Sequence, residues 1–279
     1  NSILQNCTML KIHKPKWNLL GAKSRYFIIT GGRGSGKSFE VGRFLTILSY
    51  DLQQKILFTR KTLTSAHASI IPEFTEKIDL LKRNQDFNIL KTDIENKQSG
   101  SIILFRGIQS GSKDNTANLK SLQAVNNWVL DEAEELTIEK TFDDIDLSIR
   151  RKGIQNRIIV ILNPTSKEHF IYKRFYEQAG VPDGFTGTVG DTTYIHSTYL
   201  ENLENLSESF ISRAEKMKEN NPAKYDHIMM GGWLEKAEGV VFTNWKPGPF
   251  NPDNLQTSFG QDYGYSIDPT TLVEVAIDR

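Results

Sequence analysis

The stretch of sequence that decides the fold is Gly31-Gly32-Arg33-Gly34-Ser35-Gly36-Lys37-Ser38. It fits the pattern G-x-x-x-x-G-K-[S/T] of a phosphate-binding loop (P-loop). The apolar, β-branched run from Tyr26 to Thr30 before it predicts a buried strand, and Phe39 to Tyr50 after it predicts an amphipathic helix. Loop N–H groups and a helix N-terminus both favour phosphate, so this order predicts a nucleotide triphosphate site rather than a mere glycine-rich turn.

The parts of the loop have different expected roles. The backbone of residues 31–36 is expected to wrap the phosphates, with Lys37 reaching the β- and γ-phosphates and the Ser38 hydroxyl ligating Mg²⁺. Arg33 is not required by the pattern, and two interpretations stay open. It is either a loop arginine exposed to solvent or touching a phosphate, or an arginine finger in cis that stabilises charge on the γ-phosphoryl group.

Other apolar runs alternate with helical patterns along the chain. Strands are expected at 55–59, 87–90, 101–105, 127–130, 157–162 and 192–198, and helices at 66–81, 136–150 and 170–179. Residues 107–120 are expected to form a long polar loop. This alternation predicts an α/β fold with a mainly parallel sheet and helices on both faces. Because ligands bind beyond the carboxyl ends of such strands, the P-loop, Arg60, Asp131, Glu132 and Asn163 are expected to share one edge.

Two acids end the predicted strand 127–130. Asp131 is expected to hold Mg²⁺, and Glu132 is expected to act as the catalytic base on the attacking water. The alternative is a helix N-terminus enriched in acids, and Glu134 and Glu135 are interpreted in that way, as solvated charges.

Three further polar residues carry open interpretations. Asn163 could sense the γ-phosphate or orient water, or it could simply belong to an Asn-Pro turn that ends a strand. Arg150 and Arg151 could reach the nucleotide of a neighbouring subunit, although charges at a helix C-terminus are the favoured interpretation.

Composition bounds the class of protein. The 279 residues contain 34 basic and 34 acidic side chains, so no global field points to nucleic acid. The single Cys7 excludes an intrachain disulfide and a cysteine zinc site, and is consistent with a reducing cytoplasm. The sequence contains no apolar run that predicts a transmembrane helix or signal peptide. Asn1 at the start and the interrupted strand pattern at 271–279 suggest a piece of a longer protein.

Short motifs are spread over nearly the whole chain besides the P-loop. They are Arg60-Lys61-Thr62, residues 118–121, 129–133, Asn163-Pro164, residues 196–199, Asn221-Pro222, Gly232-Trp233, residues 239–242 and residues 260–264. Together they resemble the large subunit of tailed-bacteriophage terminase, the DNA-packaging motor. The P-loop is generic, whereas His196-Ser197-Thr198-Tyr199 and the run from Gly232-Trp233 to Gln261-Asp262-Tyr263-Gly264 are much more family-specific.

The resemblance implies a domain plan. Residues 1–190 would be a P-loop ATPase domain of the additional-strand, catalytic-glutamate type, and 191–239 a small linking subdomain. Residues 240–258 would be a linker and 259–279 the truncated start of an RNase H-like nuclease. Arg33 would match an arginine that some members carry in the loop, which favours the finger. Asn163 would match the coupling motif, although Asn-Pro replaces a Ser/Thr-Gly type of sequence. Asp262 would match the first metal-binding aspartate of the nuclease, a two-metal enzyme.

The resemblance also implies a function. ATP hydrolysis with Mg²⁺ would drive translocation of double-stranded DNA into a procapsid, with a portal protein and a small terminase subunit as partners. The chain would form a homo-oligomeric ring when assembled and a monomer alone, in the cytoplasm of the infected bacterium and without a membrane. The full-length protein would cut concatemeric DNA with Mg²⁺ or Mn²⁺, whereas this chain is expected to hydrolyse ATP weakly and not to nick a plasmid. The alternatives are a helicase-like or repair P-loop ATPase, and a nucleotide-binding scaffold without appreciable turnover.

Overall fold

The structure is a computed structural model that describes residues 14–62, 66–110, 113–114, 124–235, 248–249, 251–262 and 271–276. The chain divides into two compact units, Asn1–Glu238 and Gly239–Arg279, and each is described by itself. Within the described residues, no helix is both long and apolar enough to cross a membrane.

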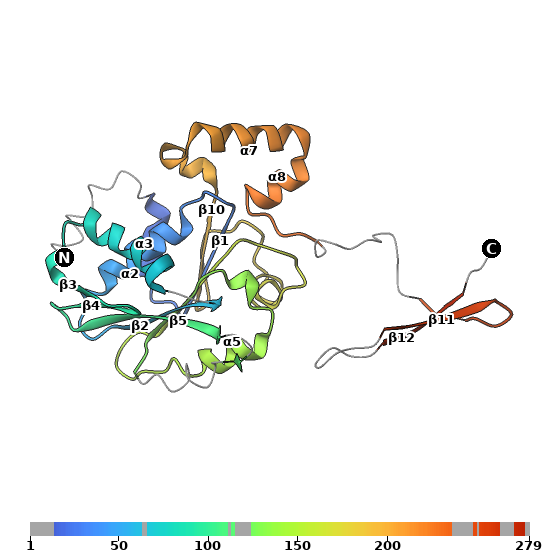
Figure 1. Ribbon diagram of the computed structural model, residues 1–279, viewed down its shortest axis with the longest axis horizontal. Coiled ribbons are helices and arrows are strands. Elements are labelled where there is room, and N and C mark those ends of the chain that lie inside the picture. Colours follow the sequence, from blue (N-terminus) through green and yellow to red (C-terminus); the bar gives the residue numbers. More distant parts are fainter. Residues whose placement is uncertain are drawn as a thin grey trace. The chain divides into compact units, whose positions relative to one another are not determined.

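A ten-stranded mixed sheet forms the centre of the first unit (Figure 1). Its strands are β1 (Tyr26–Gly31), β2 (Lys55–Thr62), β3 (Phe87–Ile89), β4 (Asp93–Asn96), β5 (Ser101–Ser110), β6 (Lys113–Asp114), β7 (Asn127–Leu130), β8 (Arg157–Leu162), β9 (Gly187–Val189) and β10 (Thr192–Ser197). The order is β3-β4-β5-β2-β7-β8-β1-β10-β9, with β6 paired to β5. Every pairing from β5 across to β10 is parallel, and the pairings at both margins are antiparallel.

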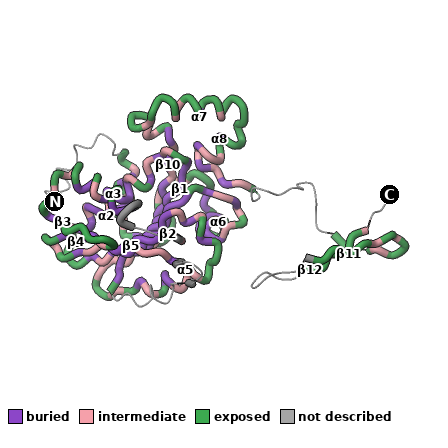
Figure 2. The backbone as a smooth tube through the Cα atoms, viewed as in Figure 1, coloured by how far each residue is buried: buried purple, intermediate pink, exposed green. Residues whose placement is uncertain are grey.

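Helical layers cover both faces of this sheet, because its central strands are apolar on both sides. One face packs against η2 (Pro15–Gly21), α2 (Lys37–Leu48) and α3 (Ala66–Leu80). The other packs against α5 (Glu139–Asp146), α6 (Phe170–Tyr172) and η5 (Lys173–Glu177). All residues of β7 and β8 are buried, and the central strands stand out as buried in Figure 2. The predicted α/β fold with a mainly parallel sheet is confirmed.

Several predicted elements differ in extent. The helix expected over 136–150 is the short α5, preceded by the 3₁₀ turn η4 (Ala133–Glu135), because Leu136 and Ile138 are extended. At the other end, Arg25 donates hydrogen bonds to the carbonyls of Asp146 and Ile149, at 3.1 and 3.2 Å, and so supplies donors that the end of a helix lacks. The helix expected over 170–179 is instead the single turn α6 followed by the π-helical turn η5.

The polar loop expected at 107–120 is partly a strand. β5 continues to Ser110 because it pairs with the full length of β2, from Lys55 opposite Ile102 to Thr62 opposite Gln109. Residues 115–123, with the motif at 118–121, lie outside the described residues. Between the strands expected at 87–90 and 101–105, the structure adds β4, which was not predicted and which pairs with both β5 and β3.

A small helical region follows β10. It contains η6 (Tyr199–Glu201), η7 (Leu203–Asn205), α7 (Glu208–Asn220) and α8 (Pro222–Ile228). A separate apolar cluster of Tyr199, Ala214, Tyr225 and Met229 holds it together. β10 itself pairs in parallel with β1, so the central sheet extends past the boundary expected at residue 190.

The second unit contains a two-stranded antiparallel sheet of β11 (Thr257–Asp262) and β12 (Thr271–Ala276). The apolar side chains of Phe259 and Leu272 are each 66% exposed. Most of the linker expected at 240–258 and the residues 263–270 lie outside the described residues.

Candidate nucleotide-binding site

The P-loop joins β1 to α2 at the carboxyl edge of the sheet. α2 begins at Lys37, and its N-cap Gly36 has φ +80° and ψ +7°, a left-handed conformation that glycine adopts without a Cβ penalty. Within the loop, the Ser35 hydroxyl donates to the carbonyl of Gly32 at 2.8 Å. The N-terminus of the 12-residue helix α2 therefore opens onto the loop, the arrangement that favours a bound phosphate.

Lys37 is buried and held inside the loop. Its ammonium donates to the carbonyls of Gly31 and Gly32 at 2.8 and 2.9 Å, and to Ser35 Oγ at 3.2 Å. A fourth bond, of 3.0 Å, reaches Asn163 Oδ1 beyond the end of β8. The ammonium therefore already lies at the point where the loop and β8 meet.

Burial changes the acidity of this lysine. It lowers the pKa of Lys37 to about 8, and the nearby carboxylates of Glu134 and Asp131 oppose that effect by favouring the charged form.

Asp131 lies directly after β7 and is buried. Its Oδ2 accepts bonds from Nε and Nη2 of Arg60, at 2.9 and 2.7 Å, and Arg60 comes from the neighbouring strand β2. The sequence places both residues at strand ends, and the parallel pairing of β2 with β7 brings them together. A guanidinium therefore neutralises the carboxylate predicted to hold Mg²⁺.

Glu132 has an unusual backbone, with φ +53° and ψ +45°. This conformation costs a residue with a side chain about 1–2 kcal/mol, and such strain concentrates at functional sites. Its side chain is 45% exposed, and its Oε2 lies 3.7 Å from Arg60 Nε. Partial burial raises the pKa of Glu132, Asp131 reinforces the shift, and Arg60 opposes it. A raised pKa suits a carboxylate that takes a proton from water.

Glu134 is not the solvated charge that the sequence predicts. Its Oε1 accepts from Asn163 Nδ2 at 2.9 Å, and its Oε2 accepts from the backbone N–H of Asn163 at 3.3 Å. Burial raises the pKa of Glu134. The turn η4 directs this side chain back towards the end of β8, and local sequence does not reveal such a turn. The sequence features that could have indicated this contact are an acid close to Glu132 and an amide, Asn163, directly after a later strand.

One cavity of about 650 Å³ brings most of the predicted residues together. Its lining includes residues 32–38, Arg60, Asp131, Glu132, Glu134, Glu135, Asn163 and Phe210. The side chains of Arg33, Ser38 and Asn163 are exposed in it.

The other predicted residues lie elsewhere. Arg151 donates to Gln53, to its carbonyl at 2.5 Å and to its Oε1 at 3.1 Å. Gln53 precedes β2, so this contact is at the amino edge, opposite the cavity of the same chain. Arg150 is exposed. Asp262 is the last residue of β11 in the second unit, where its backbone pairs with Thr271.

Sequence reasoning also missed a set of contacts that hold the P-loop from outside. Asn202 Nδ2 donates to the carbonyl of Gly34 at 2.8 Å, and Ser197 Oγ donates to the carbonyl of Ser35 at 3.1 Å. The backbone N–H of Arg33 donates to the carbonyl of Ile228 at 2.9 Å, at the end of α8. Close backbone packing of Gly231 on Gly31 completes these contacts, here called the loop clamp.

The motif at 196–199 connects the sheet to the loop clamp. The His196 ring bonds Thr30 Oγ1 through Nδ1 at 3.1 Å, and the carbonyl of Met230 through Nε2 at 2.9 Å. Burial lowers the pKa of His196. The Tyr199 hydroxyl donates to Glu215 at 2.9 Å. The motif therefore ties β1 to the chain after α8 and to α7.

The cavity offers few ligands for a metal ion from the protein itself. Within the described ranges, no three histidine, cysteine or carboxylate side chains gather as a metal-ion site. Ser38 and Asp131 line the same cavity, and one hydroxyl with one carboxylate fits a Mg²⁺ ion that takes its other oxygens from phosphates and water.

Residues 23–232 match the family model of the phage terminase large subunit. The chain belongs to the phage terminase large subunit family. It is 25% identical over 269 residues to the terminase large subunit of Bacillus phage SPP1, an alignment that covers 91% of this chain. The chain spans 60% of the length of that relative.

Solved terminases share the fold. The large terminase of a thermophilic bacteriophage has a TM-score of 0.60 at 15% identity, over 100% of this chain and 65% of its own. That thermophilic-phage terminase has also been solved with ATP-gamma-S and with ADP. The large terminase ATPase domain of Thermus phage P74-26 has a TM-score of 0.57 at 14% identity, over 78% of this chain and 92% of its own. The mainly parallel mixed sheet is thus the fold of terminase ATPase domains.

Proposed function

We propose that this terminase chain hydrolyses ATP to drive double-stranded DNA into a procapsid. The observation that carries the proposal is the convergence of Lys37, Asp131, Glu132 and Asn163 on one cavity at the carboxyl edge of the sheet. The ATP-gamma-S and ADP complexes of the thermophilic-phage terminase support ATP as the ligand.

The roles follow from position and chemistry. Loop N–H groups and Lys37 bind the β- and γ-phosphates. Ser38 and Asp131 would hold Mg²⁺, which would supply charge stabilisation for the phosphate oxygens. Glu132 orients the attacking water and accepts its proton. Arg33, exposed in the same cavity, stabilises charge on the γ-phosphoryl group in cis.

The strand order supports the additional-strand, catalytic-glutamate class. β8 lies between the P-loop strand β1 and β7, which ends at the two acids. We assign the ATPase domain to the sheet and its helices through β10, and the linking subdomain to residues 198–235, since their apolar cluster is separate. Residues 239–279 are assigned to the linker and the start of a nuclease domain, with Asp262 as its first metal ligand.

The chain spans 60% of the length of the SPP1 relative, so we propose the remaining roles for the whole protein. They are concatemer cutting with Mg²⁺ or Mn²⁺, assembly as a homo-oligomeric ring, and binding to portal and small subunit in the cytoplasm of the infected host. DNA contacts are made to phosphates, because a packaging motor must be indifferent to sequence.

The test compares three variants. Glu132→Gln should bind ATP-gamma-S like the wild type but lose ATP turnover, and Lys37→Ala should lose binding as well. Glu177→Gln, an exposed carboxylate on η5, is the matched control and should hydrolyse normally. Turnover stimulated by double-stranded DNA distinguishes a motor from a switch. Wild-type protein that binds ATP without turning it over, with or without DNA, would leave the scaffold alternative standing.

A further inference from the structure

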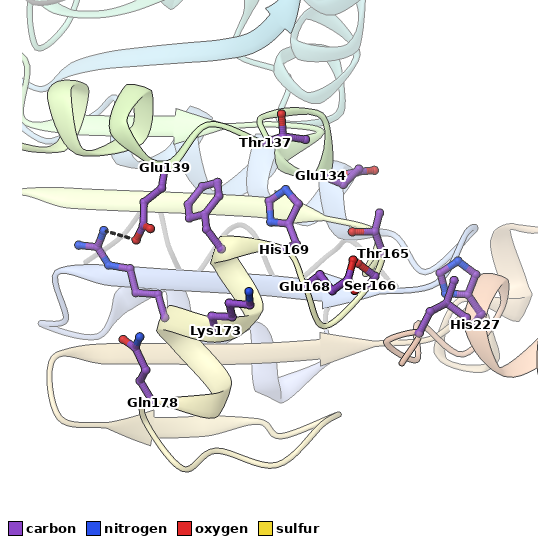
Figure 3. A pocket seen from close by; sticks show the side chains of 13 residues that line it. Glu134, Thr137, Glu139, Thr165, Ser166, Glu168, His169, Lys173, Gln178 and His227 are labelled. Carbon is purple, nitrogen blue, oxygen red and sulfur yellow. Dashed lines mark ion pairs between the residues drawn. The ribbon is translucent and has the colours of Figure 1, made fainter. Parts of the chain in front are cut away.

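A second cavity, of about 700 Å³, lies beside the nucleotide cavity. It is formed by the segment after β7, the segment after β8, α6 with η5, and His227 with Leu234 (Figure 3). Figure 3 shows Glu134 at its margin, on the same segment as Thr137 and near Thr165. Glu134 lines both cavities, so it forms part of the wall between them.

Glu134 is hydrogen-bonded to Asn163, another residue of the nucleotide cavity. Its two oxygens each accept a hydrogen bond from Asn163, one from the side-chain amide at 2.9 Å and one from the backbone N–H at 3.3 Å. The remaining polar atom of that amide, Oδ1, accepts from Lys37 Nζ at 3.0 Å. Glu134, Asn163 and Lys37 thus form one hydrogen-bonded chain from the cavity wall to the phosphate-binding lysine.

The chemistry of this chain is directional. An ionised carboxylate only accepts hydrogen bonds, so it fixes the Asn163 amide with its NH₂ group towards Glu134 and its oxygen towards Lys37. A rotation of that amide by half a turn would direct NH₂ hydrogens at a cationic ammonium. A neutral residue at position 134 would remove one of the two charged groups that orient the Asn163 amide and would leave only Lys37 to do so.

We propose that Glu134 is a positioning residue that fixes the orientation of Asn163 against Lys37 and so supports ATP hydrolysis. The inference rests on the proposed ATPase function. Glu134 is linked to Lys37 by hydrogen bonds through Asn163, and its negative charge also acts on Lys37 directly.

The test measures the effect of Glu134→Ala on kcat and on ATP KM separately. We expect kcat to fall by about tenfold, as for loss of a charge-assisted hydrogen bond, with KM changed by less than about threefold. Glu134→Gln keeps one acceptor oxygen and should retain an intermediate kcat. Glu168→Gln is the matched control, because it removes a carboxylate from the second cavity that makes no bond to Asn163.

A double-mutant cycle decides whether Glu134 acts through Asn163. In an Asn163→Ala background, Glu134→Gln should lower kcat by less than it does in the wild type, because only the direct effect of the charge on Lys37 remains, whereas independent effects would multiply. Wild-type kcat in Glu134→Ala, or multiplying effects in the cycle, would overturn the inference. If Glu134→Ala does not fold by circular dichroism, Glu134→Gln alone and in the cycle decides. Absence of turnover in the wild type is a separate outcome that would refute the proposed function instead.

Discussion

Replacing Gly231 with alanine tests how closely the chain after α8 must approach the P-loop. Gly231 has φ +75°, and a Cβ there would lie 2.5 Å from the carbonyl carbon of Gly31 and 2.6 Å from the nitrogen of Gly32. The left-handed backbone costs alanine about 1–2 kcal/mol, and overpacking costs about 1–3 kcal/mol more. We therefore expect the free energy of unfolding to fall by about 2–5 kcal/mol.

Gly180→Ala is the matched control for this substitution. Gly180 has φ +64°, and a Cβ there would meet nothing within 4 Å, so its cost should be the backbone penalty alone, about 1–2 kcal/mol. Urea unfolding followed by circular dichroism gives both values, and fluorescence titration gives the affinity for ATP-gamma-S. Gly231→Ala should weaken binding because it displaces Gly31 and Gly32. Equal unfolding free energies and unchanged affinity in the two variants would refute the steric argument and the loop clamp with it.

Three further perturbations probe the same site. Because burial lowers the pKa of Lys37 to about 8, the Kd for ATP-gamma-S should rise when the pH is raised above that value. The rise should approach about tenfold per pH unit as the ammonium loses its proton. Calorimetric titration between about pH 7 and pH 9 measures this Kd, and a Kd that does not change with pH would contradict the prediction. Arg60→Ala removes both bonds to buried Asp131 and should lower the free energy of unfolding by about 3 kcal/mol. Added Mg-ATP should recover part of that loss in a thermal melt, and no recovery would argue against Asp131 as a metal ligand. Asn202→Ala removes the bond to the carbonyl of Gly34 and should weaken ATP-gamma-S binding by about fivefold, the equivalent of one hydrogen bond, so unchanged affinity would show that the bond is dispensable.

Local sequence carried enough information for the parallel strands of the sheet and for most of the candidate site, whereas β4, β6 and β9 were not predicted. Continuous apolar runs predict buried parallel strands, and polar residues that directly follow them must meet at one edge. This geometric rule places Lys37, Arg60, Asp131, Glu132 and Asn163 around one cavity before any coordinates are known.

Contacts between distant segments could not be predicted in the same way. Glu134 looks like any acid at a helix start, and its partner Asn163 is 29 residues away. Asn202 reaches Gly34 across 168 residues, and nothing in either local pattern indicates the other. The helix expected over 136–150 begins late for a similar reason, because Leu136 and Ile138 are extended and Leu136 is buried in an apolar cluster with residues from distant strands.

The loop clamp also has a mechanical consequence. Coupling between two sites is reciprocal. If ATP binding stabilises the contacts of the P-loop with Asn202 and Ile228, then a force on α7 or α8 that breaks these contacts must lower the affinity for ATP by the factor by which ATP stabilises them. Tension on the linking subdomain would then be sensed at the phosphates through backbone contacts, without a separate relay. The fraction of ATP-bound subunits would then fall as the force that opposes DNA movement rises.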